Sequence, residues 1–203
     1  MASIGAMQSR HEERQHWKRL VFEVLLLVAS AALALMANDW NNQRERRQLA
    51  HRVLEELKLE VQQNRQEVDT ELGYHEKMAQ TFRASREALA RGEQWQQPTD
   101  FDGLHQILFQ RAAYESAMMS QTLPHLGAGT LSVLSALYTQ QDEYTQNLRI
   151  FAAATLQSDD KDARRDLRLT ENCLRQMAAS ERRLSGLMDK AKNAIETELK
   201  AHS

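Results

Sequence analysis

The side chains best suited to metal binding or acid–base chemistry are scattered along the chain. The seven histidines are His11, His16, His51, His75, His105, His125 and His202. Two His–Glu pairs have the i,i+4 spacing that places side chains on one helix face, His51 with Glu55 and Glu71 with His75. A metal centre needs three or four converging ligands, and a di-iron bundle needs Glu-x-x-His pairs on two helices. We therefore expect solvated or interfacial histidines and no metal site.

Motifs for other chemistries are missing from the sequence. It contains no glycine-rich phosphate loop, no G-x-S-x-G, no paired-cysteine zinc spacing and no H-E-x-x-H. We expect no catalytic residue, no cofactor and no enzyme activity. The lone Cys173 cannot form an internal disulfide, and whether it crosslinks two chains is left open. Tyr114, Tyr138 and Tyr144 fit a core with hydrogen-bonded hydroxyls better than a ligand cage.

One basic cluster, RERR, runs from Arg44 to Arg47. The chain has 26 basic and 28 acidic residues, a net charge of −2, and no aromatic residues interleave the arginines. Nucleic-acid binding is therefore not expected. The cluster suits anionic lipid head groups if it lies just outside a membrane.

The composition predicts an all-α fold. Of 203 residues, 27 are Leu and 26 are Ala, against 7 Val and 4 Ile. Leu and Ala favour helices, whereas β-branched residues favour strands. Sixteen of the 18 residues from 20 to 37 are apolar, which leaves the rest of the chain too polar for a thick globular core. We predict a single N-terminal transmembrane helix that continues into an elongated antiparallel helical bundle.

The apolar run Leu20–Ala37 has nearly the length that crosses a bilayer, roughly 20 residues. Trp17 and Trp40 bracket it, and their separation of ~34 Å along a helix matches the distance between the two membrane interfaces. A cleaved signal peptide is the competing interpretation, because Ala32-Leu33-Ala34 resembles a cleavage site. The acidic residues of the segment, Glu23 among them, favour an uncleaved anchor. The predicted divisions are a tail over 1–19, a span over 20–38 and a bundle over 39–203.

Glu23 is the one ionisable residue inside the run, and a charge at membrane depth is costly. Arg19 lies four residues earlier, so the two side chains can pair and reach the interface together. The alternative is that Glu23 faces a partner helix, with a row of small residues packing against it. The residues predicted to anchor or pack the span are Trp17, Lys18, Arg19, Glu23, Ser30, Ala34, Trp40, Arg44, Arg46 and Arg47.

The flanking charges do not decide the orientation by number. Four basic residues lie within about 15 positions on each side of the span. The N-terminal charges are closer to the apolar run, and the free amine adds to them. We expect a cytoplasmic N-terminus, which in a bacterial inner-membrane protein makes the C-terminal domain periplasmic.

Glycine and proline are absent between Gly5 and Gly73, so one long helix is expected to leave the span. Its outer part carries a row at sevenfold spacing: Leu54, Val61, Val68, His75, Phe82 and Leu89. The stretch 91–103 contains Gly92 and Pro98 and is predicted to connect to a second helix over 102–123.

A third helix is predicted to start near Thr130, after a loop that follows Pro124. Asp159 and Asp160 indicate a break or a new helix start. The last helix is predicted to run almost to the C-terminus. Its apolar residues are spaced by threes and fours: Leu167, Leu174, Met177, Leu184, Met188, Ala191 and Ile195.

Two stretches carry a family resemblance. Glu at the start of the run is followed by Asn-Asp-Trp-Asn and spaced arginines; the matching positions are Glu23, Asn38, Trp40, Asn41, Arg44 and Arg47. This segment, 22–47, resembles a family of bacterial single-pass membrane proteins that carry a domain of unknown function. The stretch 112–144 is similar to the family's second stretch, with Tyr114 where that family often has Trp, and SALY at 135–138. The resemblance implies a membrane anchor and a helical domain, and no assigned activity.

These features together predict a membrane-anchored helical interaction or scaffold protein, a subunit of an envelope complex. Its expected partners are the lipid bilayer and either further copies of itself or other membrane proteins. The alternative is a membrane-tethered sensory bundle that binds a small ligand.

Overall fold

The computed structural model describes the backbone of residues 5–94, 98–156 and 163–202, and the side chains of 23, 25–94, 98–153 and 164–201. Within these ranges the chain is helical and has no strand, which confirms the predicted all-α class. The elements are α1 (Gly5–Ala90), α2 (Ala112–Met119), the 3-10 helix η1 (Leu123–His125), α3 (Ala128–Leu156) and α4 (Ala163–His202). The chain divides into two units, Met1–Gln48 and Leu49–Ser203.

Unit 1 contains the first part of α1. Its described apolar side chains are exposed, among them Leu27 at 69%, Leu35 at 71% and Trp40 at 69%. Among the side chains that the structure describes, no helix is both long and apolar enough to cross a bilayer. The predicted span reaches beyond that set, because the side chains at 20–22 and 24 lie outside the described residues.

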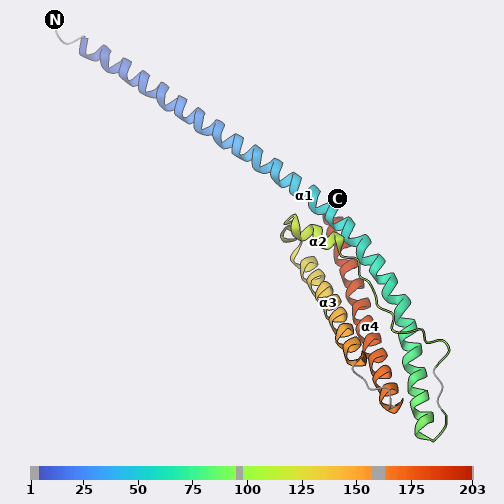
Figure 1. Cartoon of the computed structure of the whole chain (residues 1–203). Helices are drawn as coiled ribbons and strands as arrows, with labels where there is room; N and C mark the ends of the chain where they lie inside the picture. The colour runs from blue at the N-terminus through green and yellow to red at the C-terminus, as the bar shows by residue number, and fades with distance from the viewer. Residues whose placement is uncertain (1–4, 95–97, 157–162, 203) are drawn as a thin grey trace. The chain divides into compact units, whose positions relative to one another are not determined.

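Unit 2 contains the second part of α1 together with α2, α3 and α4, and Figure 1 shows α3 and α4 beside α1. Lys58 on α1 forms an ion pair with Glu196 on α4 at 3.2 Å, and Arg86 pairs with Glu171 at 2.6 Å. The residue later on α1, Arg86, pairs with the residue earlier on α4, so the two helices are antiparallel. Helix α3 is antiparallel to α4 as well, because Gly127 before α3 bonds Glu198 near the end of α4.

The predicted apolar rows form the core of unit 2. On α1, Leu54, Val61, Val68, His75 and Phe82 are at most 4% exposed, and Leu89 is half-buried. On α4, every member of the predicted row from Leu167 to Ile195 is buried. The sevenfold and three-four spacings therefore predicted the buried faces of both long helices.

The predicted second helix over 102–123 is wrong for most of its length. Residues 101–111 run along α1 without helical structure, and α2 covers only Ala112–Met119. The Asn64 side chain on α1 explains part of this difference. Its Oδ1 accepts the Gln110 backbone N–H and its Nδ2 donates to the Gln110 carbonyl, both at 2.8 Å. These bonds satisfy the backbone as a neighbouring strand would. Leu108 in this segment is 79% exposed.

The end of α1 is set by Gly92. Gly92 has a φ of +83°, its N–H donates to the Leu89 carbonyl, and the Glu93 N–H donates to the Ala88 carbonyl. This pair of bonds is the Schellman motif, which needs a residue in the left-handed conformation just after a helix. Helix α3 begins at Ala128, two residues before the predicted start. The predicted break at 159–160 lies outside the described residues.

Candidate functional site

A polar cluster occupies the centre of the unit 2 core. His75 on α1 and Glu181 on α4 are both 0% exposed, and His75 Nδ1 lies 2.8 Å from Glu181 Oε1. Tyr144 on α3 is 3% exposed, and its hydroxyl donates to the same oxygen at 2.8 Å. One carboxyl oxygen thus joins the three long helices of the unit. The expectation that His75 is solvated or interfacial is wrong, and Glu71 is not its partner.

The same layer contains hydrogen-bonding capacity that no described residue uses. His75 Nε2, Glu181 Oε2 and both amide atoms of Gln141 are buried without a partner among the described residues. Burial and the neighbouring Glu181 raise the pKa of Tyr144, which keeps its hydroxyl protonated as a donor.

A second histidine, His105, holds the non-helical segment 101–111 against α1. His105 Nδ1 lies 2.8 Å from Glu71 Oε2, and His105 Nε2 lies 2.8 Å from Asp102 Oδ1. The His105 ring stacks on Tyr74 with a centroid distance of 3.9 Å. Burial lowers the pKa of His105, but the hydrogen bonds and charges of Glu71 and Asp102 outweigh burial and raise it. Because a carboxylate faces each ring nitrogen, only the protonated ring donates to both.

A third polar contact fixes the start of α2. Glu60 on α1 is 4% exposed and accepts hydrogen bonds from the Tyr138 hydroxyl and, at 2.7 Å, from the Ala113 backbone N–H. Ala113 lies in the first turn of α2, where backbone N–H groups lack intrahelical partners. Tyr114 stacks on Tyr138 with centroids 3.7 Å apart. The predicted hydrogen-bonded core hydroxyls are confirmed for Tyr138 and Tyr144.

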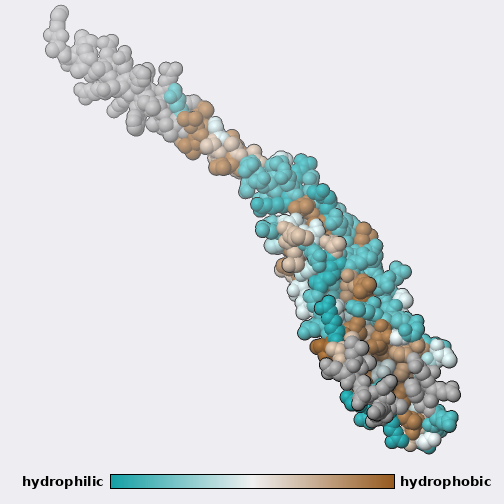
Figure 2. All heavy atoms as spheres, in the orientation of Figure 1, coloured by the Kyte–Doolittle hydropathy of each residue, from teal (hydrophilic) through white to brown (hydrophobic). Residues whose placement is uncertain are grey.

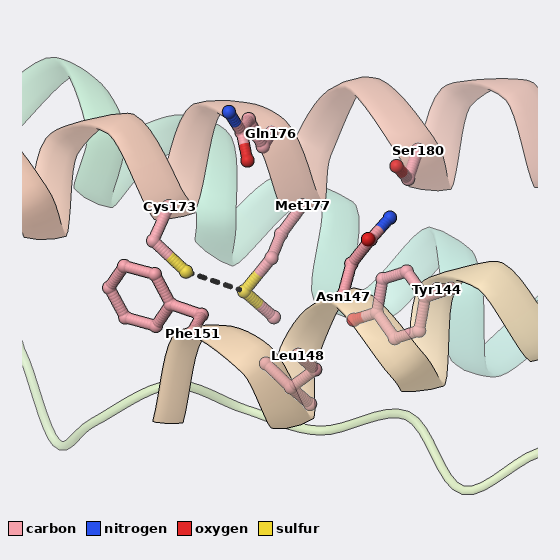
Figure 3. A pocket seen from close by; sticks show the side chains of 8 residues that line it. All are labelled: Tyr144, Asn147, Leu148, Phe151, Cys173, Gln176, Met177 and Ser180. Carbon is pink, nitrogen blue, oxygen red and sulfur yellow. Dashed lines mark hydrogen bonds between the residues drawn. The ribbon is translucent and has the colours of Figure 1, made fainter. Parts of the chain in front are cut away.

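A small cavity lies beside this layer, between α3 and α4 (Figure 3). Its volume is about 40 Å³, and its walls include Tyr144, Leu148, Phe151, Cys173 and Met177. Ligand pockets usually measure roughly 300–1,000 Å³, so this space fits water-sized molecules only. The Cys173 thiol donates to the Met177 sulfur at 3.7 Å, and burial raises the pKa of that thiol to about 12.

The residues predicted to anchor the span lie on α1 in unit 1. Glu23, Ser30, Ala34, Trp40, Arg44, Arg46 and Arg47 are all exposed. The Ser30 hydroxyl donates to the Leu26 carbonyl at 2.7 Å, which leaves it satisfied within its own helix. The side chains of Trp17, Lys18 and Arg19 lie outside the described residues. Among the described side chains, no group of three or more His, Cys, Asp or Glu could hold a metal ion.

Sequence reasoning missed the pairing of His75 with Glu181, although the signal for it was present. His75 stands in the sevenfold apolar row, and Glu181 lies four residues after Met177 and three before Leu184, in the apolar spacing of α4. A polar residue at a core position of each of two antiparallel helices predicts a buried pair. The register between the helices, which the sequence does not reveal, decides whether the two residues meet.

No family model, no curated protein and no solved structure matches this chain. The resemblance to the family of bacterial single-pass membrane proteins therefore stays a prediction.

Proposed function

We propose that this chain is a membrane-anchored helical interaction protein, a non-enzymatic subunit or scaffold of a bacterial envelope complex. In this proposal, residues 20–38 cross the inner membrane once, and the bundle of unit 2 lies in the periplasm. The bundle contacts further copies of the chain or other membrane proteins.

The observation that carries the proposal is the exposure of the apolar part of unit 1. Leu25, Leu26, Leu27, Val28, Leu33, Leu35 and Met36 are 55–71% exposed. They fall on every side of the helix, and Figure 2 shows this described stretch as brown and pale residues. A helix that is apolar all round needs an apolar environment on all sides, and a bilayer supplies one.

Membrane extraction followed by topology mapping tests the anchor. Full-length protein expressed in a bacterium is expected to stay in the membrane fraction at full length after washing with alkaline carbonate. A phosphatase fused after Ser203 is expected to be active, and a fluorescent protein fused there dark, because both readouts depend on the compartment. Release by carbonate, or a shortened chain, would refute the anchor. Inverse activity of the two fusions would reverse the orientation and move the partner search to the cytoplasm.

Glu23 provides the test of helix packing within the membrane. If Glu23 faces a partner helix, Glu23→Gln is expected to reduce crosslinking between chains, or recovery of a partner after mild detergent extraction. The matched control is Ser30→Ala, because the Ser30 hydroxyl is bonded within its own helix. Unchanged recovery for Glu23→Gln would leave its pairing with Arg19 as the better account. An extract with neither self-association nor a partner would contradict the interaction role.

A groove between α1 and α4 favours ligand sensing as a second candidate. Its volume is about 180 Å³, and three arginines line it, Arg83, Arg175 and Arg182, together with Glu76 and Glu171. Arg83 pairs with Glu87 and Arg182 pairs with Glu76, whereas Arg175 has no carboxylate partner among the described residues, so Arg175 is the cation that suits a small anion. A thermal-shift screen of the full chain against small anions tests this role, since a ligand that binds only the folded chain raises its melting temperature. Saturable stabilisation lost in Arg175→Gln would favour sensing, and no stabilisation would exclude this groove.

A further inference from the structure

Three arginines follow Trp40 on α1 within unit 1. Arg44, Arg46 and Arg47 are exposed, and among the described residues none of them has a carboxylate within ion-pair distance.

The acid nearest in sequence does not neutralise this cluster. Glu45 accepts a hydrogen bond from Asn41 Nδ2 at 2.9 Å. In the unit 2 part of α1, by contrast, Arg65 pairs with Asp69 and Asp189. The cations of the cluster therefore keep their capacity for an anionic partner from outside the chain.

The placement of the arginines on the helix indicates which partner this is. At 100° per residue they spread over about 160° of the circumference, so no narrow stripe of the helix carries all three. They lie ~6 to ~11 Å beyond Trp40 along the helix axis. If the Trp40 ring sits at the membrane interface, these backbone positions begin at the outer edge of the head-group layer, which is about 5–7 Å thick, and the long arginine side chains can reach back to the phosphates.

We propose that Arg44, Arg46 and Arg47 bind the phosphate groups of anionic phospholipids where α1 leaves the bilayer. The guanidinium group donates two parallel hydrogen bonds to a phosphate, and it is more weakly hydrated than an ammonium group. Lipid head groups surround the helix on all sides, so their phosphates can bind arginines that point in different directions. This inference rests on the proposed membrane anchor.

Lipid retention by the full-length chain tests the inference. The protein is reconstituted into mixed vesicles of phosphatidylcholine and phosphatidylglycerol, embedded chain is selected by carbonate washing, and bound lipid is counted by native mass spectrometry after mild detergent extraction. The wild-type chain is expected to retain phosphatidylglycerol in preference to phosphatidylcholine. Each arginine contributes about fivefold to retention, so the triple variant Arg44→Gln, Arg46→Gln and Arg47→Gln is expected to lose the preference.

Two further variants separate this site from net charge. The triple Lys190→Gln, Lys192→Gln and Lys200→Gln on α4 removes the same charge from unit 2 and is expected to retain lipid as wild type does. The triple arginine-to-lysine variant at 44, 46 and 47 is expected to lose part of the preference, because the charge remains but the paired guanidinium hydrogen bonds do not. Equal retention by wild type and the arginine-to-glutamine triple, or equal loss in the α4 triple, would overturn the inference. A chain that embeds without lipid preference refutes only this inference, whereas a chain that fails to embed refutes the anchor as well.

Discussion

The buried pair of His75 and Glu181 is predicted to be strongly coupled. His75→Leu leaves the Glu181 carboxyl group in a fully buried position with the Tyr144 hydroxyl as its remaining partner. Removing one member of a buried pair costs about 3–5 kcal/mol of unfolding free energy, because the other member is left uncompensated. A whole domain is stable by only about 5–15 kcal/mol. This single substitution is therefore expected to remove a large part of the stability of unit 2.

Replacing both members is predicted to cost less than replacing one. The double variant His75→Leu and Glu181→Leu places Leu in two apolar rows, an exchange that is often neutral in itself. It also leaves the Tyr144 hydroxyl without this acceptor, at a cost of about 1–3 kcal/mol. Tyr144→Phe keeps the ring and loses only the hydrogen bond to Glu181, at a cost of about 1.5–3 kcal/mol if the acceptor is charged. The order of stability is thus expected to be wild type, double variant, then His75→Leu, with Tyr144→Phe above His75→Leu.

Urea unfolding of the full chain in mild detergent, followed by circular dichroism, measures these differences. With a slope of about 2 kcal/mol per molar urea, His75→Leu is expected to lower the midpoint by roughly 2 M. The matched control is Glu76→Gln with Arg182→Gln, which removes a surface pair between the same two helices, worth about 0–1 kcal/mol. The single variant Glu181→Leu completes the comparison. If the double variant loses as much stability as His75→Leu and Glu181→Leu added together, the coupling is refuted.

Three further predictions concern His105, Cys173 and Asn64. Because the pKa of His105 is raised in the folded chain, its contribution is complete below the ordinary histidine pKa of 6.5 and is lost as pH rises through the folded value. Hydrogen exchange over 98–111 is therefore expected to speed up with pH beyond its intrinsic pH dependence. The buried Cys173 thiol, with a pKa of about 12, is expected to react with a disulfide reagent only on unfolding, and not to crosslink native chains. Asn64→Ala is expected to cost roughly 1–3 kcal/mol, because Gln110 loses both side-chain bonds.

Each of these predictions has a contrary outcome. His105→Gln should remove the extra pH dependence, and exchange with the same extra pH dependence in that variant would exclude His105 as its cause. Rapid labelling of Cys173 in native chain, or a dimer that disappears on reduction, would contradict its burial. Gln63→Ala, at an exposed position beside Asn64, controls for helix propensity. Equal stability of Asn64→Ala and Gln63→Ala would show that the two hydrogen bonds between Asn64 and the Gln110 backbone contribute nothing to stability.

The long helices were predictable because periodicity and the absence of breakers act within one segment. The buried rows of α1 and α4 could be read from residues such as Leu54 and Leu184 without knowledge of any partner. The non-helical structure of segment 101–111 could not be predicted, because its local sequence pattern is compatible with a helix. Its extended form depends on Asn64 and Glu71, which lie more than 30 positions earlier in the chain. Long-range hydrogen bonds of this kind override local propensity.

The polar contacts also fix the register between the helices, which the apolar rows alone leave open. Leu and Ala rows that repeat every seven residues can pack in several registers, each shifted by two helical turns. A shift of α4 along α1 would separate His75 from Glu181 and leave both buried without each other, and a shift of α3 would separate Tyr138 from Glu60. A buried polar contact can fix register in helical assemblies in this way. The residues that looked least suited to a core in the sequence are therefore the ones that select a single arrangement of the three helices.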